Sequence, residues 1–242
     1  MSPESVHGDI VGDHGGAPVA ARYRRNLGAL RRAVQERLFA SHALVVGLGG
    51  LSGHVIEQLA RCGVGRITGV DPDVFDETNL NRQLLATTAT LGQHKVAAAR
   101  ERLALVNPDC IFAGIIGRHP EVPEIVWSTV DLVFECLDNI ADRLDLAARC
   151  MRMDRTLIHG AVAGWYGQVA VVWPGQDTVR LLYPEFGPGW ERDLGTPPFT
   201  VGLVGSLMVA QGIKVLSGSA APSSRRVDFL DIRECRRVQT AV

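Results

Sequence analysis

The most constraining feature of the sequence is a strand, a glycine-rich turn, a helix and a second strand that ends in an acidic residue. The apolar run Ala43–Val46 predicts a buried strand that enters the turn Gly47-Leu48-Gly49-Gly50. A helix is expected over Leu51–Cys62 and the next strand over Arg66–Asp71. This order predicts an α/β fold with a Rossmann-like, doubly wound, mostly parallel sheet.

The rest of the chain first continues this alternation and then departs from it. Further helices are expected over residues 26–40, Gly92–Val106, 141–153 and Val201–Leu216, and further strands over Cys110–Ile116, Asp131–Glu135, Leu157–Gly160 and Val227–Ile232. Two segments that flank Pro174-Gly175-Gln176-Asp177, namely Gln168–Trp173 and Thr178–Leu182, predict antiparallel strands that extend the sheet. Gly187–Thr200 predicts a long loop. We expect one domain over residues 21–242 and a flexible N-terminal arm over residues 1–20.

The glycine turn predicts a nucleotide site. Gly47, Gly49 and Gly50 lack a Cβ, so phosphate oxygens can approach backbone N–H groups at the start of a helix. Asp71 ends the next strand, where a carboxylate accepts hydrogen bonds from ribose hydroxyls. Because Ser52 replaces the third glycine of the dinucleotide motif, this pattern leaves NAD, ATP and an empty tight turn open.

A concentrated polar set follows that strand and favours a triphosphate. The segment Asn79-Leu80-Asn81-Arg82-Gln83 is followed by Lys95 within 25 residues of the acidic strand end. A dehydrogenase needs the glycines and the ribose-binding acid but not this set, whereas attack on the α-phosphorus of ATP does need positive charge at the phosphates.

Composition narrows the function classes. The 25 Lys and Arg residues and the 26 Asp and Glu residues give a net charge of −1, which disfavours nucleic acid as a partner. The N-terminus carries no apolar secretion signal, and Val201–Ile213 is too short and too polar for a membrane span. Five cysteines, an odd number, favour a reducing cytoplasmic location.

Taken together, these motifs resemble the ThiF/MoeB/HesA adenylyltransferases, the bacterial relatives of ubiquitin-activating enzymes. The resemblance runs from Arg22 to about Leu216. Besides the glycine turn, its carriers are Val70-Asp71-Pro72-Asp73, Asn79-Leu80-Asn81-Arg82-Gln83, Gly92-Gln93-His94-Lys95-Val96, Asn107-Pro108, Cys136-Leu137-Asp138-Asn139, His159-Gly160-Ala161 and Gly167-Gln168-Val169.

The resemblance implies adenylation of the C-terminal glycine of a ubiquitin-like sulfur carrier protein, of the ThiS or MoaD kind, with release of pyrophosphate. By similarity Asp71 binds the ribose of ATP, and Asn79, Arg82, Gln83 and Lys95 line the nucleotide site. Asp138 resembles the family's Mg²⁺ ligand. Arg25 resembles an arginine that reaches into the partner protomer's site, which implies a homodimer.

Simpler interpretations exist for each of these residues. Arg82 could be a surface arginine, Lys95 a solvated residue near a helix start, and Asp138 the N-cap of the next helix. Arg25 lies in a segment with five arginines between Arg22 and Arg32, so it could belong to a solvated basic face. Asp73 could assist a metal or cap a loop.

The sequence departs from the family pattern in its cysteines. Many relatives carry two Cys-x-x-Cys pairs that hold a structural zinc, and this sequence has none, so we expect no zinc. The segment Tyr183–Thr200, where some relatives place a reactive cysteine, also has none. Cys136 is the one thiol close to the expected site, and a small buried residue explains it better than a nucleophile.

We therefore expect a Mg-ATP-dependent adenylyltransferase that stops at the acyl-adenylate. Three other functions are left open by the sequence. The first is adenylation of a substrate other than a carrier, such as threonylcarbamoyl-adenosine in tRNA or a short peptide. The second is an NAD(P)-dependent oxidoreductase, and the third is a carrier-binding scaffold without turnover.

Overall fold

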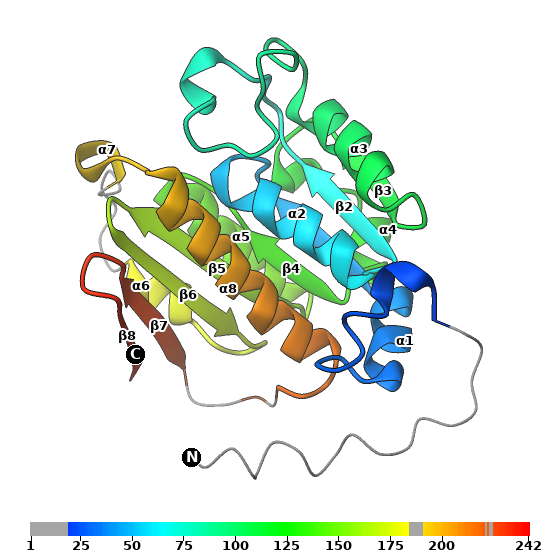
Figure 1. Cartoon of the computed structure of the whole chain (residues 1–242). Coiled ribbons are helices and arrows are strands. Elements are labelled where there is room, and N and C mark those ends of the chain that lie inside the picture. The colour runs from blue at the N-terminus through cyan, green and yellow to red at the C-terminus, as the bar shows by residue number, and fades with distance from the viewer. Residues whose placement is uncertain (1–18, 184–190, 221, 223–224) are drawn as a thin grey trace.

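A computed structural model describes residues 19–183, 191–220, 222 and 225–242, so most of the expected N-terminal arm lies outside the described residues. Eight strands form one sheet in the order β3-β2-β1-β4-β5-β6-β7-β8 (Figure 1). Their bounds are β1 His42–Val46, β2 Arg66–Val70, β3 Ile111–Ile115, β4 Leu132–Glu135, β5 Thr156–Ala163, β6 Tyr166–Val172, β7 Arg226–Asp231 and β8 Arg236–Ala241. The five neighbouring strands β3, β2, β1, β4 and β5 are parallel, and β6, β7 and β8 join them antiparallel. The predicted fold class is confirmed.

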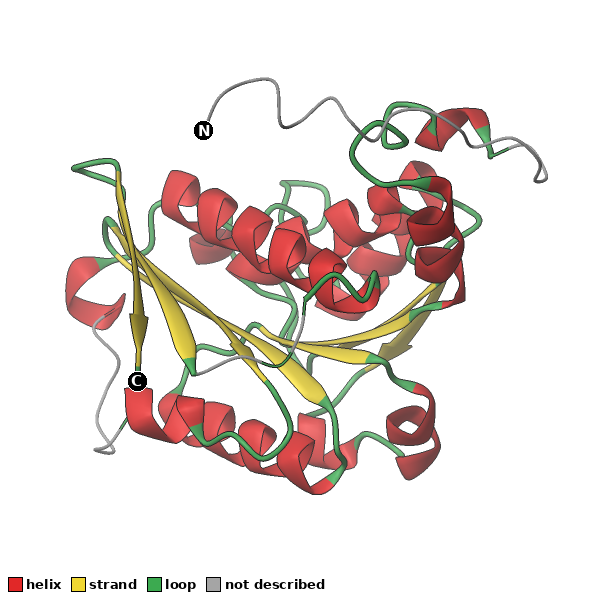
Figure 2. Cartoon of the chain, turned by 90° about the horizontal axis from the view of Figure 1, so that it is seen from below, coloured by secondary structure: helices red, strands yellow, loops and turns green. Residues whose placement is uncertain are grey.

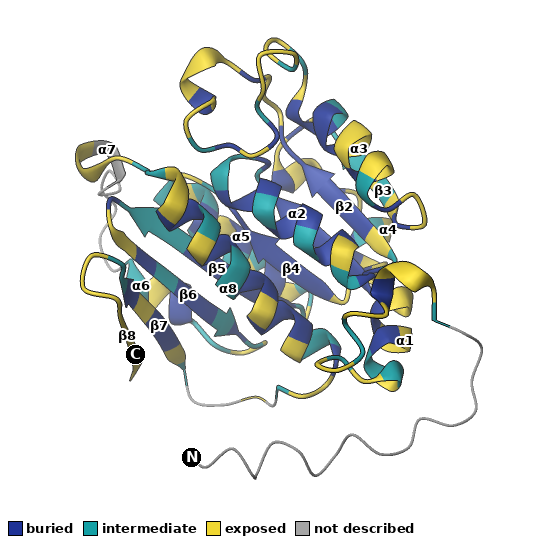
Figure 3. Cartoon of the chain, in the orientation of Figure 1, coloured by how far each residue is buried: buried dark blue, intermediate teal, exposed yellow. Residues whose placement is uncertain are grey.

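Helices cover both faces of the sheet (Figure 2). One face is covered by α1 Arg32–Ala40, α2 Gly50–Cys62, α3 Lys95–Val106 and α8 Pro198–Leu216, and the other by α4 Glu124–Thr129, α5 Ile140–Arg152 and α6 Thr178–Leu182. The sheet separates two hydrophobic cores: the first lies under α1, α2, α3 and α8, and the second lies under α4, α5 and α6. Successive residues of β1 point to opposite faces, so Val45 packs in the first core while Leu44 and Val46 pack in the second. Because both faces of these strands are covered, β1 is apolar except at His42 and β4 is apolar except at Glu135. Figure 3 shows β2 and β4 largely buried as well.

Helix α8 is long and apolar enough to cross a membrane by length and composition alone. Half of its apolar window is buried inside the protein, where α8 packs against α2 and against β5 and β6. Its apolar character is therefore explained by packing in the first core, as the sequence predicted.

Two predicted elements are wrong. Thr178–Leu182 is the short helix α6 and not a strand, because its buried Thr178 and Val179 cover α5 and β6 while β7 takes the place beside β6. The pattern of a short apolar run does not distinguish the repeat of a helix from the repeat of a strand. The loop expected over Gly187–Thr200 falls partly on residues 187–190, outside the described residues. Its remainder contains α7 Glu191–Leu194 and the start of α8, where Pro198 fits the first turn because that turn needs no N–H from it.

Smaller differences concern element ends and elements that the sequence did not predict. Helix α1 begins at Arg32, not at residue 26, and α3 begins at Lys95, after Gly92 with φ +79°. Strand β8 was missed because all six of its residues are exposed and carry no apolar alternation. Helix α4 was missed because it is only six residues long.

Candidate active site

A pocket of about 430 Å³ opens at the carboxyl ends of β1, β2 and β4. Strand β1 has β2 on one side and β4 on the other, which makes this the point where the chain reverses its direction across the sheet. Ligands of open α/β sheets bind at such a point. The pocket brings together Gly47, Gly49, Gly50, Asp71, Arg82, Gln83, Lys95 and Asp138 of the predicted residues.

The glycine turn lies against the turn that follows β4. Gly47 has φ +85°, and a Cβ on it would lie 2.6 Å from the carbonyl oxygen of Cys136. Helix α2 begins at Gly50, and its N-cap Gly49 supplies no side-chain acceptor. The first N–H groups of α2 are therefore left without a side-chain cap at the pocket, which is the arrangement that binds phosphate.

Asp71 is held by backbone donors on both oxygens. Its Oδ2 accepts from Leu48 N at 2.6 Å and its Oδ1 from Asp73 N at 2.8 Å. Burial raises the pKa of this carboxyl above the ordinary value of an aspartate. Each oxygen retains a second lone pair, so the carboxylate can still accept hydroxyl hydrogens such as those of a ribose.

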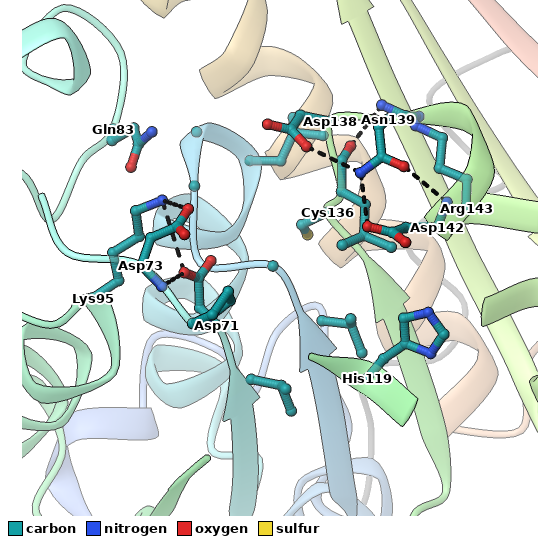
Figure 4. A pocket seen from close by; sticks show the side chains of 18 of the residues that line it. Asp71, Asp73, Gln83, Lys95, His119, Cys136, Asp138, Asn139, Asp142 and Arg143 are labelled. Atoms are coloured by element: carbon teal, nitrogen blue, oxygen red, sulfur yellow. Dashed lines mark hydrogen bonds and ion pairs between the residues drawn. The ribbon is translucent and has the colours of Figure 1, made fainter. Parts of the chain in front are cut away.

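Lys95 is the first residue of α3 and lies between two carboxylates (Figure 4). Its Nζ is 2.9 Å from Asp73 Oδ2 and 3.8 Å from Asp71 Oδ1. Only 8% of its side chain is exposed, so it is not the solvated residue that the simpler interpretation required. The same contacts show what Asp73 does in this structure, which is to pair with Lys95.

Arg82 and Gln83 reach the pocket from the segment after the short helix η3 Glu77–Asn79. Arg82 Nη1 donates to Thr78 O and to Asn81 Oδ1, each at 2.9 Å. Gln83 is buried, and its Oε1 has no hydrogen-bond partner among the described residues. Arg82 can therefore offer positive charge to phosphates, and Gln83 has an unused acceptor.

Asn79 does not line the pocket in this structure. It is buried, and its Oδ1 accepts from Asp76 N at 3.3 Å while Asp76 Oδ1 accepts from Thr78 N at 2.7 Å. This reciprocal capping shapes the turn that carries Arg82. The role of Asn79 in phosphate binding stays a prediction.

Asp138 faces the pocket from the other side, directly after β4 (Figure 4). It is exposed and is not an N-cap, because Asn139 caps α5 by accepting from Asp142 N at 2.8 Å. Within the described part of the chain, no three His, Cys, Asp or Glu side chains gather as a metal site. A single open carboxylate beside a phosphate-binding turn fits Mg²⁺, which is commonly held by one or two carboxylates together with substrate phosphates.

Arg25 is exposed in the segment between η2 Ala21–Tyr23 and α1, and it is not among the described residues that line the pocket. The structure of one chain therefore does not bring Arg25 to this site.

The pocket also contains residues that the sequence did not single out for the site. Arg118 and His119 follow β3, and Asp142 and Arg143 lie in the first turn of α5. His119 is 3% exposed, its Nε2 is 3.4 Å from Asp145 Oδ2, and burial lowers the pKa of its ring. The position of Arg118, His119 and Asp142 just after the carboxyl ends of two parallel strands was the signal that could have identified these three residues.

Cys136 lines the pocket but is buried. Burial, and secondarily the carboxylate of Glu135, raises the pKa of its thiol well above the ordinary value. Because the thiolate is the nucleophile, this environment disfavours covalent catalysis by Cys136.

Comparisons with known proteins place the chain among related sequences. The family model described as the ThiF family matches residues 23–241. The molybdopterin-synthase adenylyltransferase of Escherichia coli (strain K12) is 34% identical over 218 residues, which cover 84% of this chain and 83% of that protein. The sulfur carrier protein ThiS adenylyltransferase of the same strain is 32% identical over 194 residues, which cover 78% and 77%.

A solved structure has the same fold. The crystal structure of E. coli MccB with ATP superposes with a TM-score of 0.75 at 20% identity and covers 92% of this chain and 72% of that one. At this level of identity the likeness extends to the fold alone.

Proposed function

The chain belongs to the ThiF family and is an adenylyltransferase, and on this premise we propose that it activates the C-terminal glycine of a ubiquitin-like sulfur carrier protein with Mg-ATP. The observation that carries the proposal is the pocket itself. An uncapped helix start, Lys95 and Arg82 face an exposed carboxylate, Asp138, across one cavity. The reaction of an NAD(P)-dependent oxidoreductase would not require Lys95, Arg82 and Asp138 together at one site.

The proposed reaction is an in-line displacement at phosphorus. A carboxylate oxygen of the carrier attacks the α-phosphorus of ATP, the bond from that phosphorus to the bridging oxygen of the β-phosphate breaks, and pyrophosphate leaves. Two anions must meet in this step, so positive charge has to be in place before they do. Lys95 and Arg82 supply it at the phosphates, while Asp71 orients the nucleotide through the ribose.

Asp138 would hold Mg²⁺, which neutralises phosphate charge when bound. Its exposed carboxylate lies across the pocket from Lys95, so Asp138 would hold the cation while Lys95 would offer its ammonium group from the other side of the pocket. Lys95 also has to exchange its contact with Asp73 for one with a phosphate. Because Asp73 is 62% exposed, this exchange moves a solvated carboxylate at small cost.

The carrier's C-terminal peptide would enter beside the β5–β6 hairpin, near Gly164–Val169. Val162, Thr196 and Val201 line the pocket on that side. The hairpin is tied to the start of α8, because Gly164 N donates to Gly195 O at 2.7 Å and Thr200 Oγ1 donates to Gly164 O at 2.8 Å. These small and apolar residues suit an extended chain that ends in glycine.

Three further parts of the proposal rest on single features. The raised thiol pKa of Cys136 supports a reaction without a covalent cysteine step. Arg25, exposed and away from this chain's pocket, suits a role in the site of a second copy in a homodimer. Five free cysteines fit a reducing cytoplasm, and we propose no structural zinc.

Exchange of radiolabelled pyrophosphate into ATP tests the proposal. The purified protein would be assayed with Mg²⁺ and with each ThiS- or MoaD-like carrier of its own organism, and the matched control is the same carrier without its terminal glycine. We expect exchange with one carrier and none with the shortened form. ATP binding without exchange for any carrier would contradict the choice of substrate and point to a short peptide or threonylcarbamoyl-adenosine, and NAD binding in place of ATP would contradict the reaction.

A further inference from the structure

The backbone turn that carries Asp138 is held by hydrogen bonds to both the N–H and the C=O of Leu137. Leu137 N donates to Glu135 Oε1 at 2.8 Å, and Leu137 O accepts from Arg143 Nη2 at 2.6 Å. Glu135 and Arg143 are themselves paired, with Nη1 3.7 Å from Oε2. The residue next to Asp138 is thus fixed between a buried anion and a buried cation.

Arg143 is in turn fixed by groups from distant elements. Its Nη1 donates to Gly160 O on β5 and to Tyr183 Oη after α6, each at 3.2 Å. Its guanidinium carbon lies 5.7 Å from the centre of the Tyr183 ring. These contacts hold the guanidinium in an orientation in which its fork reaches Leu137 O.

Behind this arginine, Glu135 belongs to a cluster with His159, Gln168 and Tyr183, in which Glu135 and His159 are buried and the other two are half-buried. His159 Nδ1 lies 2.5 Å from Glu135 Oε2, and both side chains are completely buried. Gln168 Nε2 lies 3.1 Å from His159 Nε2 and donates to Tyr183 Oη at 2.5 Å. The charge of the buried Glu135 is stable only while its hydrogen-bond partners are in place, so these contacts restrict the arrangement of the cluster.

The opposite side of the turn rests on the glycine loop. The space where a Cβ of Gly47 would be is filled by Cys136 O at 2.6 Å and Leu137 N at 3.3 Å. Cys136-Leu137-Asp138 therefore lies between the phosphate-binding turn and the cluster, and both restrict its movement.

The side chain of Asp138 is only weakly held by contacts of its own. Among the residues that the structure describes, the one hydrogen bond to its carboxylate comes from Asn139 Nδ2 at 3.5 Å. Its position relative to the glycine turn must therefore come from its backbone, and that backbone is set through Leu137.

We propose that Arg143 is a positioning residue for Asp138, and that the cluster of Glu135, His159, Gln168 and Tyr183 holds Arg143 in the orientation that presents the Asp138 carboxylate to the metal-bound nucleotide. The inference rests on the proposed function in one respect only, which is that Asp138 holds a divalent cation together with the nucleotide. It does not depend on which carboxylate the protein adenylates.

Two variants test it in the full-length protein. Arg143→Lys keeps the charge but loses the fork that spans Leu137 O, Gly160 O and Tyr183 Oη. Tyr183→Phe is milder and removes only the hydroxyl that accepts hydrogen bonds from Arg143 and Gln168. Arg155→Lys is the matched control, because Arg155 also donates to two backbone carbonyls, Trp127 O at 3.1 Å and Ser128 O at 3.3 Å, at the other end of the sheet.

The measured quantities are Mn²⁺ affinity in the presence of a non-hydrolysable ATP analogue, by electron paramagnetic resonance, and affinity for the same analogue in EDTA. We expect Arg143→Lys to weaken Mn²⁺ binding about 10- to 100-fold, as is usual for groups that orient a metal ligand. Tyr183→Phe should weaken it less, and the control and all metal-free affinities should be unchanged.

Mn²⁺ affinity at the parent level in both folded variants would overturn the inference and leave the proposed function intact. A parallel loss of metal-free nucleotide binding would also overturn it, because the cluster would then shape the whole pocket. If Arg143→Lys fails to fold, Tyr183→Phe alone decides. Absence of Mn²⁺ binding by the parent protein would overturn the metal role of Asp138 and this inference together, whatever carrier supports pyrophosphate exchange.

Discussion

The two sides of the pocket are built in different ways. On one side, the glycine turn, Asp71 and Lys95 come from a continuous stretch of the chain, and their contacts are made mostly within that stretch. On the other side, Asp138 is exposed and its turn is held by β4, α5, β5, β6 and the end of α6. The first side is local and compact in sequence, whereas the second depends on the tertiary fold.

This difference explains where sequence reasoning works. Residues that act through a local turn occur at fixed spacings in the sequence, so a sequence motif identifies them. Residues that act by holding another residue leave no spacing signal, because their partners come from other elements. The two sides should therefore respond differently to substitution.

The largest expected effect is at Asp138. Asp138→Ala removes the carboxylate proposed to hold Mg²⁺, so we expect metal-dependent pyrophosphate exchange to fall by more than about 100-fold, beyond the loss usual for groups that only orient a ligand. The thermal midpoint should not change, since Asp138 is exposed and accepts only a 3.5 Å hydrogen bond. Retained exchange in Asp138→Ala would mean that the metal site is assigned to the wrong residue.

Glu135→Gln tests the tertiary side through stability. Removing the charge of a completely buried partner of Arg143 and His159 should cost about 3–5 kcal/mol at pH 7. Arg143 is the largest influence that lowers the pKa of Glu135, against a desolvation effect that raises it, and the net pKa lies below the ordinary 4.5. The stabilisation is therefore present above about pH 4.5 and is lost as the pH falls through the folded-state pKa.

Thermal midpoints of the parent and of Glu135→Gln, measured from pH 7 downward, check this prediction. The two curves should be well separated at neutral pH and should converge in acid. A constant separation at every pH would show that the charge of Glu135 does not contribute to stability.

The local side should lose binding without losing stability. Lys95→Ala and Arg82→Ala each remove a charged donor to phosphate, which is worth about 1.5–3 kcal/mol, or roughly 10- to 100-fold in ATP affinity. Arg102→Ala is a suitable control, because Arg102 is an arginine that pairs with Glu57 and not with the pocket. Calorimetric titration with ATP measures all three, and parent-like affinity in both pocket variants would contradict the phosphate assignment.

The smallest expected effect is at Cys136. Cys136→Ser replaces a buried thiol whose raised pKa keeps it protonated, so pyrophosphate exchange should stay at the parent level. Loss of exchange in a protein that still unfolds cooperatively would restore a covalent role for this thiol.

Particular residues show how far the sequence could predict the molecule. Strand β1 was predicted because Ala43–Val46 is an apolar run, and Gly47, Asp71 and Lys95 were predicted from the motifs that contain them. Arg143 was not identified, because an arginine near a helix start is ordinarily solvated and only the fold places it against Leu137.

The errors have the same origin. Helix α6 has no period that distinguishes it from a strand, and its conformation is decided by what it covers. The sequence places His159 in a motif but does not show its partner, Glu135, which lies on another strand. Arg25 remains a prediction because its proposed target belongs to a second copy of the chain.

The most direct test of the central claim is the intact mass of the carrier after incubation with the protein, ATP and Mg²⁺, followed by quenching with hydroxylamine. We expect a carrier that gains one AMP moiety at its terminal glycine before the quench and a hydroxamate at the same carboxyl after it, with the mass of the enzyme unchanged. A carrier that stays unmodified, or that becomes attached to the enzyme through a bond that a thiol reductant cleaves, would contradict it.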